Sequence, residues 1–259
     1  MFHKIILKAK KVIAIFFFNR SLHFIILTIH TFNNMKTKIT LVLLLSLVTY
    51  AANAQYPPYY FGLKAAPQIS WMKPDADTYE GAGAKVGFAW GFIAEFNFTE
   101  NHSIGTGFNM LFNGGKLKFP AVQNGDTGTM IRDYSIKYIE IPLSLKMRTN
   151  DINGMRFFGR IGLGTAFKLS AKKTDEFTPE GGSVVTGTKT NYDDVALFRE
   201  SLIVGLGAEY EIKEGPKLGA ELTFNNGFTN ILSGKNTLNT SLNEKATLNF
   251  FELAFSVLF

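Results

Sequence analysis

Alternation of apolar and polar side chains is the main pattern in this chain, and it is clearest in residues 137–147, KYIEIPLSLKM. Ile141, Leu143 and Leu145 share one parity, whereas Glu140 and Lys146 share the other. Successive side chains of a β-strand point to opposite faces, so this stretch predicts a strand with one hydrocarbon face and one charged face. The hydrocarbon face must then lie either against a protein core or against lipid.

Eight segments with this period of two follow residue 55. Their ranges are 59–71, 84–98, 103–119, 132–147, 155–170, 196–210, 217–229 and 246–259. Three connections are short and rich in turn formers, and the other four, 72–83, 120–131, 171–195 and 230–245, are longer and polar. Strands that run alternately up and down place the short turns at one end and the long loops at the other, as in outer-membrane barrels. We therefore expect an all-β, antiparallel, up-and-down transmembrane β-barrel of about eight strands.

The apolar faces are long and rich in phenylalanine, which favours lipid contact over a soluble sandwich with the same alternation. Charged side chains of the opposite parity then lie inside a narrow barrel, where buried charges need partners. We expect a structural network in the lumen, formed by Lys64, Glu95, Glu140, Lys146, Arg160, Lys168, Arg199, Glu209, Glu221 and Glu252. A partner-binding or gating role for Glu140 is the alternative to a structural salt bridge.

Glycines recur on the charged parity of three segments, in IGTGF (104–108), IGLGTAF (161–167) and VGLGAEY (204–210). Small inward residues leave room for large side chains opposite them. A dinucleotide-binding fingerprint is excluded, because none of the three motifs completes GxGxxG and no helical pattern follows.

An export signal precedes the alternating segments. Residues 35–54 combine Lys36 and Lys38, a short apolar run and an Ala-Asn-Ala site, which predicts a signal peptide cleaved between Ala54 and Gln55. The chain from 55 to 259 is then the mature barrel domain. Residues 1–34 lie upstream of this signal, and we expect translation to start at Met35, the alternative being a membrane helix that follows Met1.

Net charge gives no support to nucleic-acid binding. The formal charge is +6, but residues 1–54 hold seven basic residues and no acidic residue, which leaves 20 basic and 21 acidic residues in 55–259. A basic groove is therefore not expected. The chain has no cysteine, which excludes disulfides and thiolate metal sites.

Catalytic chemistry has little to build on, and we expect no enzyme, cofactor or metal site. Residues 55–259 hold one histidine, His102, in a predicted short turn. A narrow barrel filled with charges is expected to conduct little, unlike an open porin. A small barrel enzyme and a periplasmic carrier with an apolar lumen are the alternatives. The longest predicted loop, 171–195, is the expected contact surface for a protein partner.

The motif YIEIPLSLKMR (138–148), the early strand YYFGLKAAPQIS (59–70) and the terminal ELAFSVLF (252–259) resemble the PorT-like outer-membrane β-barrel proteins. The resemblance covers residues 55–259 and implies a barrel in the outer membrane of a Gram-negative bacterium, in contact with its lipid. A structural or interaction role is expected, and a part in protein secretion is the alternative. The terminal aromatic strand, with Phe255, Val257 and Phe259, is similar to the signal that the barrel-assembly machinery reads.

Overall fold

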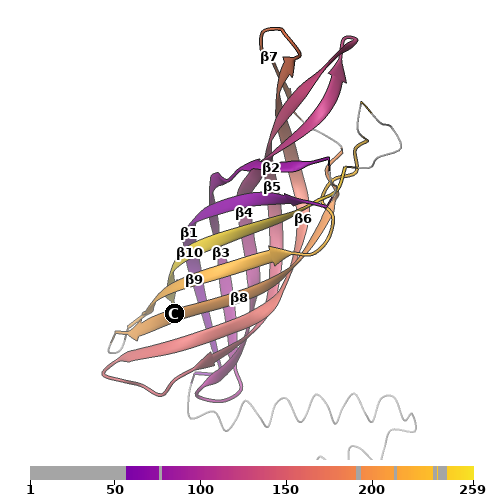
Figure 1. Cartoon of the computed structure of the whole chain (residues 1–259). Coiled ribbons are helices and arrows are strands. Elements are labelled where there is room, and N and C mark those ends of the chain that lie inside the picture. The colour runs from indigo at the N-terminus through magenta and orange to yellow at the C-terminus, as the bar shows by residue number, and fades with distance from the viewer. Residues whose placement is uncertain (1–56, 76–77, 191–193, 213–214, 236–237, 239–243) are drawn as a thin grey trace, which may run out of the picture. The chain divides into compact units, whose positions relative to one another are not determined.

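A computed structural model describes residues 57–75, 78–190, 194–212, 215–235, 238 and 244–259. The predicted signal peptide and the upstream segment fall outside these residues. The described part of the chain contains ten strands (Figure 1). They are β1 (Tyr59–Pro74), β2 (Glu80–Gly83), β3 (Lys85–Asn97), β4 (His102–Gln123), β5 (Asp126–Arg148), β6 (Met155–Pro179), β7 (Val185–Thr190), β8 (Phe198–Glu211), β9 (Lys217–Gly227) and β10 (Ala246–Leu258).

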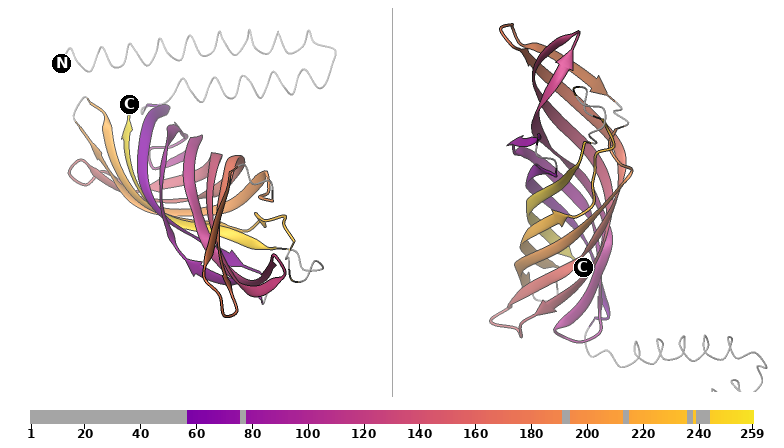
Figure 2. Two further views of the ribbon diagram at one scale, coloured as in Figure 1. Left: turned by 90° about the horizontal axis from the view of Figure 1, so that it is seen from above. Right: turned by 45° about the vertical axis from the view of Figure 1, so that its right-hand side comes forward.

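Eight of these strands close into a ring in the order β4-β3-β1-β10-β9-β8-β6-β5, because β5 also pairs with β4. All the pairings are antiparallel, and strands that are neighbours in the ring follow one another along the chain, so the predicted up-and-down barrel is confirmed (Figure 2). The ring closes between β1 and β10, where Gly62 lies opposite Leu258 and Pro74 lies opposite Ala246. No helix within the described residues has the length and apolarity needed to cross a membrane.

Side chains follow the predicted parity. On β5, Ile141 and Leu143 are exposed on the outside of the ring, whereas Glu140 and Lys146 are buried inside it. This arrangement is the reverse of a soluble carrier, which would have an apolar lumen. On β3 the outward apolar set runs from Val86 to Phe96. At about 3.3 Å per residue and a tilt of about 40°, this run spans roughly 25 Å, the height of the apolar band of an outer-membrane barrel.

Three of the predicted long loops are wrong, because they are largely strands, and the first of them, 72–83, holds the end of β1 and the whole of β2. The β4–β5 hairpin continues through the predicted loop 120–131 to a tight turn at Asn124 and Gly125. Both residues have positive φ (56° and 92°), as a two-residue type I′ turn requires. The predicted loop 171–195 holds the end of β6 and the whole of β7. Pairing with neighbouring strands provides hydrogen-bond partners for the backbone N–H and C=O groups of this extension. One stripe of buried hydrophobic side chains packs the extension together, so strands form there although the composition is polar. That stripe includes Leu117, Phe119, Met130, Ala171 and Phe177.

Pro142 lies at an interruption in the pairing of β4 with β5. Gly105 pairs with Ser144 and Asn109 pairs with Glu140, but no pairing joins the residues between them. Since the register is the same on both sides of the interruption, this is a distorted rung and not a bulge. Pairing with β6 continues through Pro142, so the missing proline N–H leaves its gap on the β4 side.

Candidate functional site

The interior of the ring holds an ion-pair network, and the structure places nine of the ten predicted charged residues in it. They are Lys64, Glu95, Glu140, Lys146, Arg160, Arg199, Glu209, Glu221 and Glu252. The tenth, Lys168, is half-buried and donates a hydrogen bond to the backbone carbonyl of Val195, with no carboxylate at ion-pair distance among the described residues. Arg148, which the sequence analysis missed, completes the network.

Two carboxylates from separate strands share two cations near the short-turn end of the barrel. Lys146 on β5 lies 2.8 Å from Glu95 on β3 and also contacts Glu209 on β8. Arg148 contacts Glu95 as well, and its Nε donates to Glu209 Oε2 at 3.0 Å. None of these four side chains is more than 3% exposed. Each buried charge therefore has two partners of opposite sign, which offsets its desolvation.

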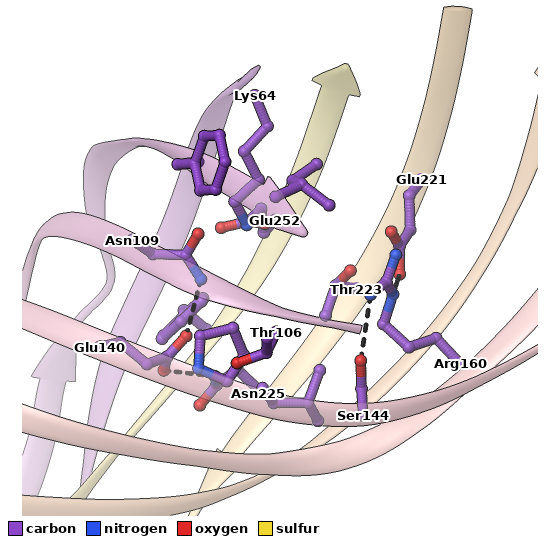
Figure 3. Close-up of a pocket in the computed structure, with 15 residues that line it drawn as sticks. Lys64, Thr106, Asn109, Glu140, Ser144, Arg160, Glu221, Thr223, Asn225 and Glu252 are labelled. Atoms are coloured by element: carbon purple, nitrogen blue, oxygen red, sulfur yellow. Dashed lines mark hydrogen bonds and ion pairs between the residues drawn. The ribbon is translucent and has the colours of Figure 1, made fainter. Parts of the chain in front are cut away.

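Arg160 connects this cluster to the middle of the barrel. Its Nε donates to Glu221 Oε1 at 2.7 Å, its Nη1 donates to Ser144 Oγ at 3.1 Å, and its Nη2 lies 3.4 Å from Glu95 Oε1. The guanidinium thus joins residues of β3, β5 and β9 across the lumen, and Figure 3 shows its contacts with Glu221 and Ser144.

Glu140, the acidic residue of the YIEIP motif, accepts hydrogen bonds from two amides. Asn109 Nδ2 lies 3.1 Å from Oε1, and Asn225 Nδ2 lies 3.2 Å from Oε2 (Figure 3). Arg199 Nη1 lies 3.6 Å from the same Oε2, and the guanidinium carbon is 5.3 Å from the ring centroid of Phe250. Glu140 is therefore held in place by its neighbours.

Lys64 and Glu252 form the remaining pair, between β1 and β10, with 2.5 Å between Nζ and Oε1. Gln68 Nε2 donates to the other oxygen of Glu252 at 2.9 Å. A cavity of about 50 Å³ lies between this pair, Glu140 and Arg160 (Figure 3). A space of this size holds a few water molecules.

The inward glycines make room for the charged side chains. A Cβ on Gly164 would lie 2.8 Å from Glu140 Oε2, and one on Gly105 would lie 2.9 Å from a terminal nitrogen of Arg160. Any larger residue at these positions would displace a member of the network. The glycine motifs of the sequence therefore serve the interior packing.

A second polar cluster, which sequence reasoning missed, lies in the extension beyond the ring. Arg132 on β5 donates to both oxygens of Asp175 on β6 at 2.6 and 3.2 Å, and to Glu244 Oε1 at 3.1 Å. Tyr134 donates to the other oxygen of Glu244 at 3.4 Å. Burial raises the pKa of Glu244 above its ordinary value of 4.5, and the attraction of Arg132 only partly offsets this. Arg132 and Tyr134 have the same parity as Tyr138, so the alternation of β5 predicts an inward side chain at both positions.

His102 and the residues of the predicted assembly signal lie outside the interior network. His102 is exposed at the start of β4, where its Nδ1 lies 2.9 Å from Thr99 Oγ1. No group of three or more His, Asp or Glu residues is arranged to hold a metal ion within the described residues. Of the predicted assembly signal, Phe255 and Val257 lie on the outward parity of β10, and Phe259, the residue after this strand, is 72% exposed.

Comparison with known proteins gives one family match. A family model described as an outer membrane protein beta-barrel domain matches residues 47–255. Among solved structures, Neisserial surface protein A is 15% identical, with 76% of this chain and 95% of that chain covered and a TM-score of 0.41. Ail of Yersinia pestis is 13% identical (78% and 100% covered, TM-score 0.37), and OprG of Pseudomonas aeruginosa is 10% identical (78% and 96% covered, TM-score 0.43). No curated protein matches the sequence.

Proposed function

The chain belongs to the outer membrane protein β-barrel domain family, and we propose that it is a closed membrane anchor. In this proposal the parts of the β4–β5 and β6–β7 hairpins that extend beyond the ring form an exterior sheet, which contacts a protein partner. The observation that carries this proposal is the paired interior. Five acidic and five basic side chains neutralise one another there, and the cavity that remains between them measures about 50 Å³. A lumen filled in this way should conduct little.

Within this family we propose a PorT-like protein. The motif on which that resemblance rests supplies Glu140, Lys146 and Arg148, and all three belong to the interior network. The motif is therefore explained by packing of the barrel. It does not by itself carry a secretion activity to this chain.

The exterior sheet is the proposed contact surface. The β4–β5 and β6–β7 hairpins continue beyond the ring. Figure 1 shows that, of the described strands, they extend farthest beyond the ring at its long-loop end. Val184 and Val185, at the start of β7, are 59% and 50% exposed. Exposed aliphatic side chains at the tip of an ordered hairpin are suited to a protein contact.

Export through cleavage between Ala54 and Gln55, insertion by the barrel-assembly machinery through the C-terminal strand, and the absence of catalysis belong to the same proposal. Mass spectrometry of the mature N-terminus tests the cleavage site. A heat-modifiable band that requires detergent for release tests the inserted barrel. The variant His102→Ala should leave any lipid hydrolysis by the purified protein unchanged.

Conductance tests the closed anchor. Wild-type protein in a planar bilayer should give no large stable currents. The double variant Glu140→Ala/Arg199→Ala, which removes a central pair, should raise the conductance, whereas Arg156→Ala, which removes the partly exposed pair with Glu100 at the short-turn end, should not. Large currents from the wild type would refute the closed anchor.

Crosslinking tests the contact surface. A photoreactive residue at Val184 should trap a protein in intact cells, and the same residue at lipid-facing Leu143 should not. Equal crosslinked adducts at both positions, or no adduct at Val184, would refute the proposed contact surface. The barrel would then be a membrane anchor alone.

A further inference from the structure

Asparagine followed by glycine occurs four times in the chain, and the structure separates one of these pairs from the other three. The pairs are Asn113-Gly114, Asn124-Gly125, Asn153-Gly154 and Asn226-Gly227. In such a pair the backbone nitrogen of the glycine is able to attack the side-chain carbon Cγ of the asparagine, because glycine has no Cβ to shield that nitrogen. Reaction in a folded protein then depends on whether the glycine N–H is free and whether water reaches the asparagine.

Polar side chains hold the glycine N–H in three of the four pairs. The hydrogen bonds, each 3.0 Å long, run from Gly114 N to Ser70 Oγ, from Gly154 N to Asp151 Oδ1 and from Gly227 N to Asn249 Oδ1. Each bond must break before the nitrogen attacks, so it slows the reaction. Asn113 is also only 3% exposed, which keeps water away from its side chain.

The remaining pair, Asn124-Gly125, lacks this protection. It forms the tip of the β4–β5 hairpin, beyond the last paired residues, and both of its residues are exposed. Gly125 N–H has no hydrogen-bond acceptor among the described residues. A Cβ built on Gly125 would meet no atom within 4 Å. No contact in the described part of the chain therefore opposes rotation of the Asn124 side chain toward this nitrogen.

The pair Asn153-Gly154 has the same backbone conformation in different surroundings. Its φ angles are 56° and 85°, and those of Asn124 and Gly125 are 56° and 92°. The turn at Asn153 is packed, because Gly154 O accepts a hydrogen bond from Glu211 N at 3.0 Å and a Cβ on Gly154 would lie 3.3 Å from the ring of Tyr210. The two turns thus provide a comparison within one chain, in which the surroundings of the glycine differ and its conformation does not.

We propose that Asn124 is a site of spontaneous deamidation, which adds a negative charge to the tip of the β4–β5 hairpin as the protein ages. Gly125 N forms a bond to Asn124 Cγ and gives its proton to water. The bond between Cγ and Nδ2 breaks, and the side-chain nitrogen takes up a proton and leaves as ammonia. Solvent water then adds to either carbonyl carbon of the cyclic imide and opens it, which gives aspartate or isoaspartate. No group is oxidised or reduced.

Either product changes the tip of the exterior sheet. The new carboxylate lies two residues from Asp126, so the tip gains a second acidic side chain. The isoaspartate product also adds a methylene to the backbone of a two-residue turn, and the length of such a turn fixes the register of its hairpin. The proposal requires only an exposed tip, so it is independent of the closed anchor and of the contact surface at Val184.

Peptide mapping by tandem mass spectrometry tests the site. The purified protein, in detergent micelles, is kept at neutral pH and physiological temperature and sampled over days. The mass gain from replacement of NH₂ by OH should appear about tenfold faster at Asn124 than at Asn153, because a hydrogen bond protects the second turn. In denaturant, where native hydrogen bonds are lost, the two pairs should react at comparable rates.

Two variants of Asp151 test the physical reason. Asp151→Ala removes the acceptor of Gly154 N–H and should accelerate deamidation of Asn153. Asp151→Asn retains an acceptor oxygen and should leave Asn153 as slow as in the wild type. Neither change should alter the rate at Asn124, which lies at the opposite end of the β5 strand.

Three results would overturn the proposal. They are equal rates at Asn124 and Asn153 in the folded wild type, the same excess at Asn124 in denaturant, and no accumulation of the product at Asn124 in outer membranes recovered at increasing times after protein synthesis is stopped. An unchanged rate at Asn153 in Asp151→Ala would refute protection by the hydrogen bond. The first two comparisons use only the wild type, so they decide the question even if a variant does not fold.

Discussion

Lys146 is the residue whose replacement tests the interior network most directly. Lys146→Met removes the cation between Glu95 and Glu209 while keeping a long unbranched side chain. Removing one partner of a buried pair costs about 3–5 kcal/mol, because the remaining charges stay buried. Arg148 still contacts both carboxylates, so we expect about 3 kcal/mol, the lower end of that range.

Guanidinium unfolding in detergent micelles measures this loss, with the fluorescence of Trp71 and Trp90 as the probe. A loss of about 3 kcal/mol lowers the midpoint by roughly 0.5–1.5 M. The companion Lys146→Met/Glu209→Gln removes a carboxylate together with the cation and should recover part of the stability. Arg156→Met is the control, because its partner Glu100 is partly exposed, and we expect less than about 1 kcal/mol.

Two results would refute this reasoning. If Lys146→Met unfolds within about 1 kcal/mol of the wild type, the buried carboxylates do not depend on this cation. If the companion is no more stable than Lys146→Met, the penalty does not come from an uncompensated charge, and loss of packing would be the cause.

Three further changes probe other parts of the barrel. Gly164→Val places a side chain against Glu140 Oε2, and we expect a lower unfolding midpoint from overpacking of about 1–3 kcal/mol. Pro142→Ala restores an N–H at the interrupted rung, so stability should rise by about 0.5–1.5 kcal/mol and the amides of residues 106–108 should exchange more slowly. The raised pKa of Glu244 means that the folded state holds this proton to a higher pH than the unfolded state. The wild type should therefore lose stability relative to Glu244→Gln as the pH rises from 4.5 to neutrality, measured as the difference in unfolding midpoints.

The ring of strands was predictable because every spanning strand obeys two demands at once. Lipid requires an apolar outward parity, and a narrow lumen accepts charges only on the other parity. On β5 these demands place Ile141 outside and Glu140 inside, as the alternation predicts. The extensions beyond the ring lack contact with lipid, so their outward residues are polar, and a polar composition predicts loops there.

Pairing within the lumen could not be predicted, because parity assigns a side chain to a face but not to a partner. Lys146 reaches Glu95, 51 residues away, and Glu209, 63 residues away, only because β3 and β8 lie on either side of β5 in the ring. Arg148 ends its strand beside a turn, where a charge is equally compatible with solvent. Lys168 has the expected parity, but it lies next to the β6 bulge, where a backbone carbonyl takes the place of a carboxylate partner.

The buried charges fix the register of the strands, which the apolar outer surface cannot do. A strand that slips by two residues keeps its apolar side chains toward lipid, so contact with fluid acyl chains does not oppose the slip. The same slip of β5 would move Glu140 away from Asn109 and Asn225, and Lys146 away from Glu95, leaving buried charges without partners. The interior network therefore sets the register of the barrel. The charged motif accordingly lies in β5, a strand that pairs with both of its neighbours over a long stretch.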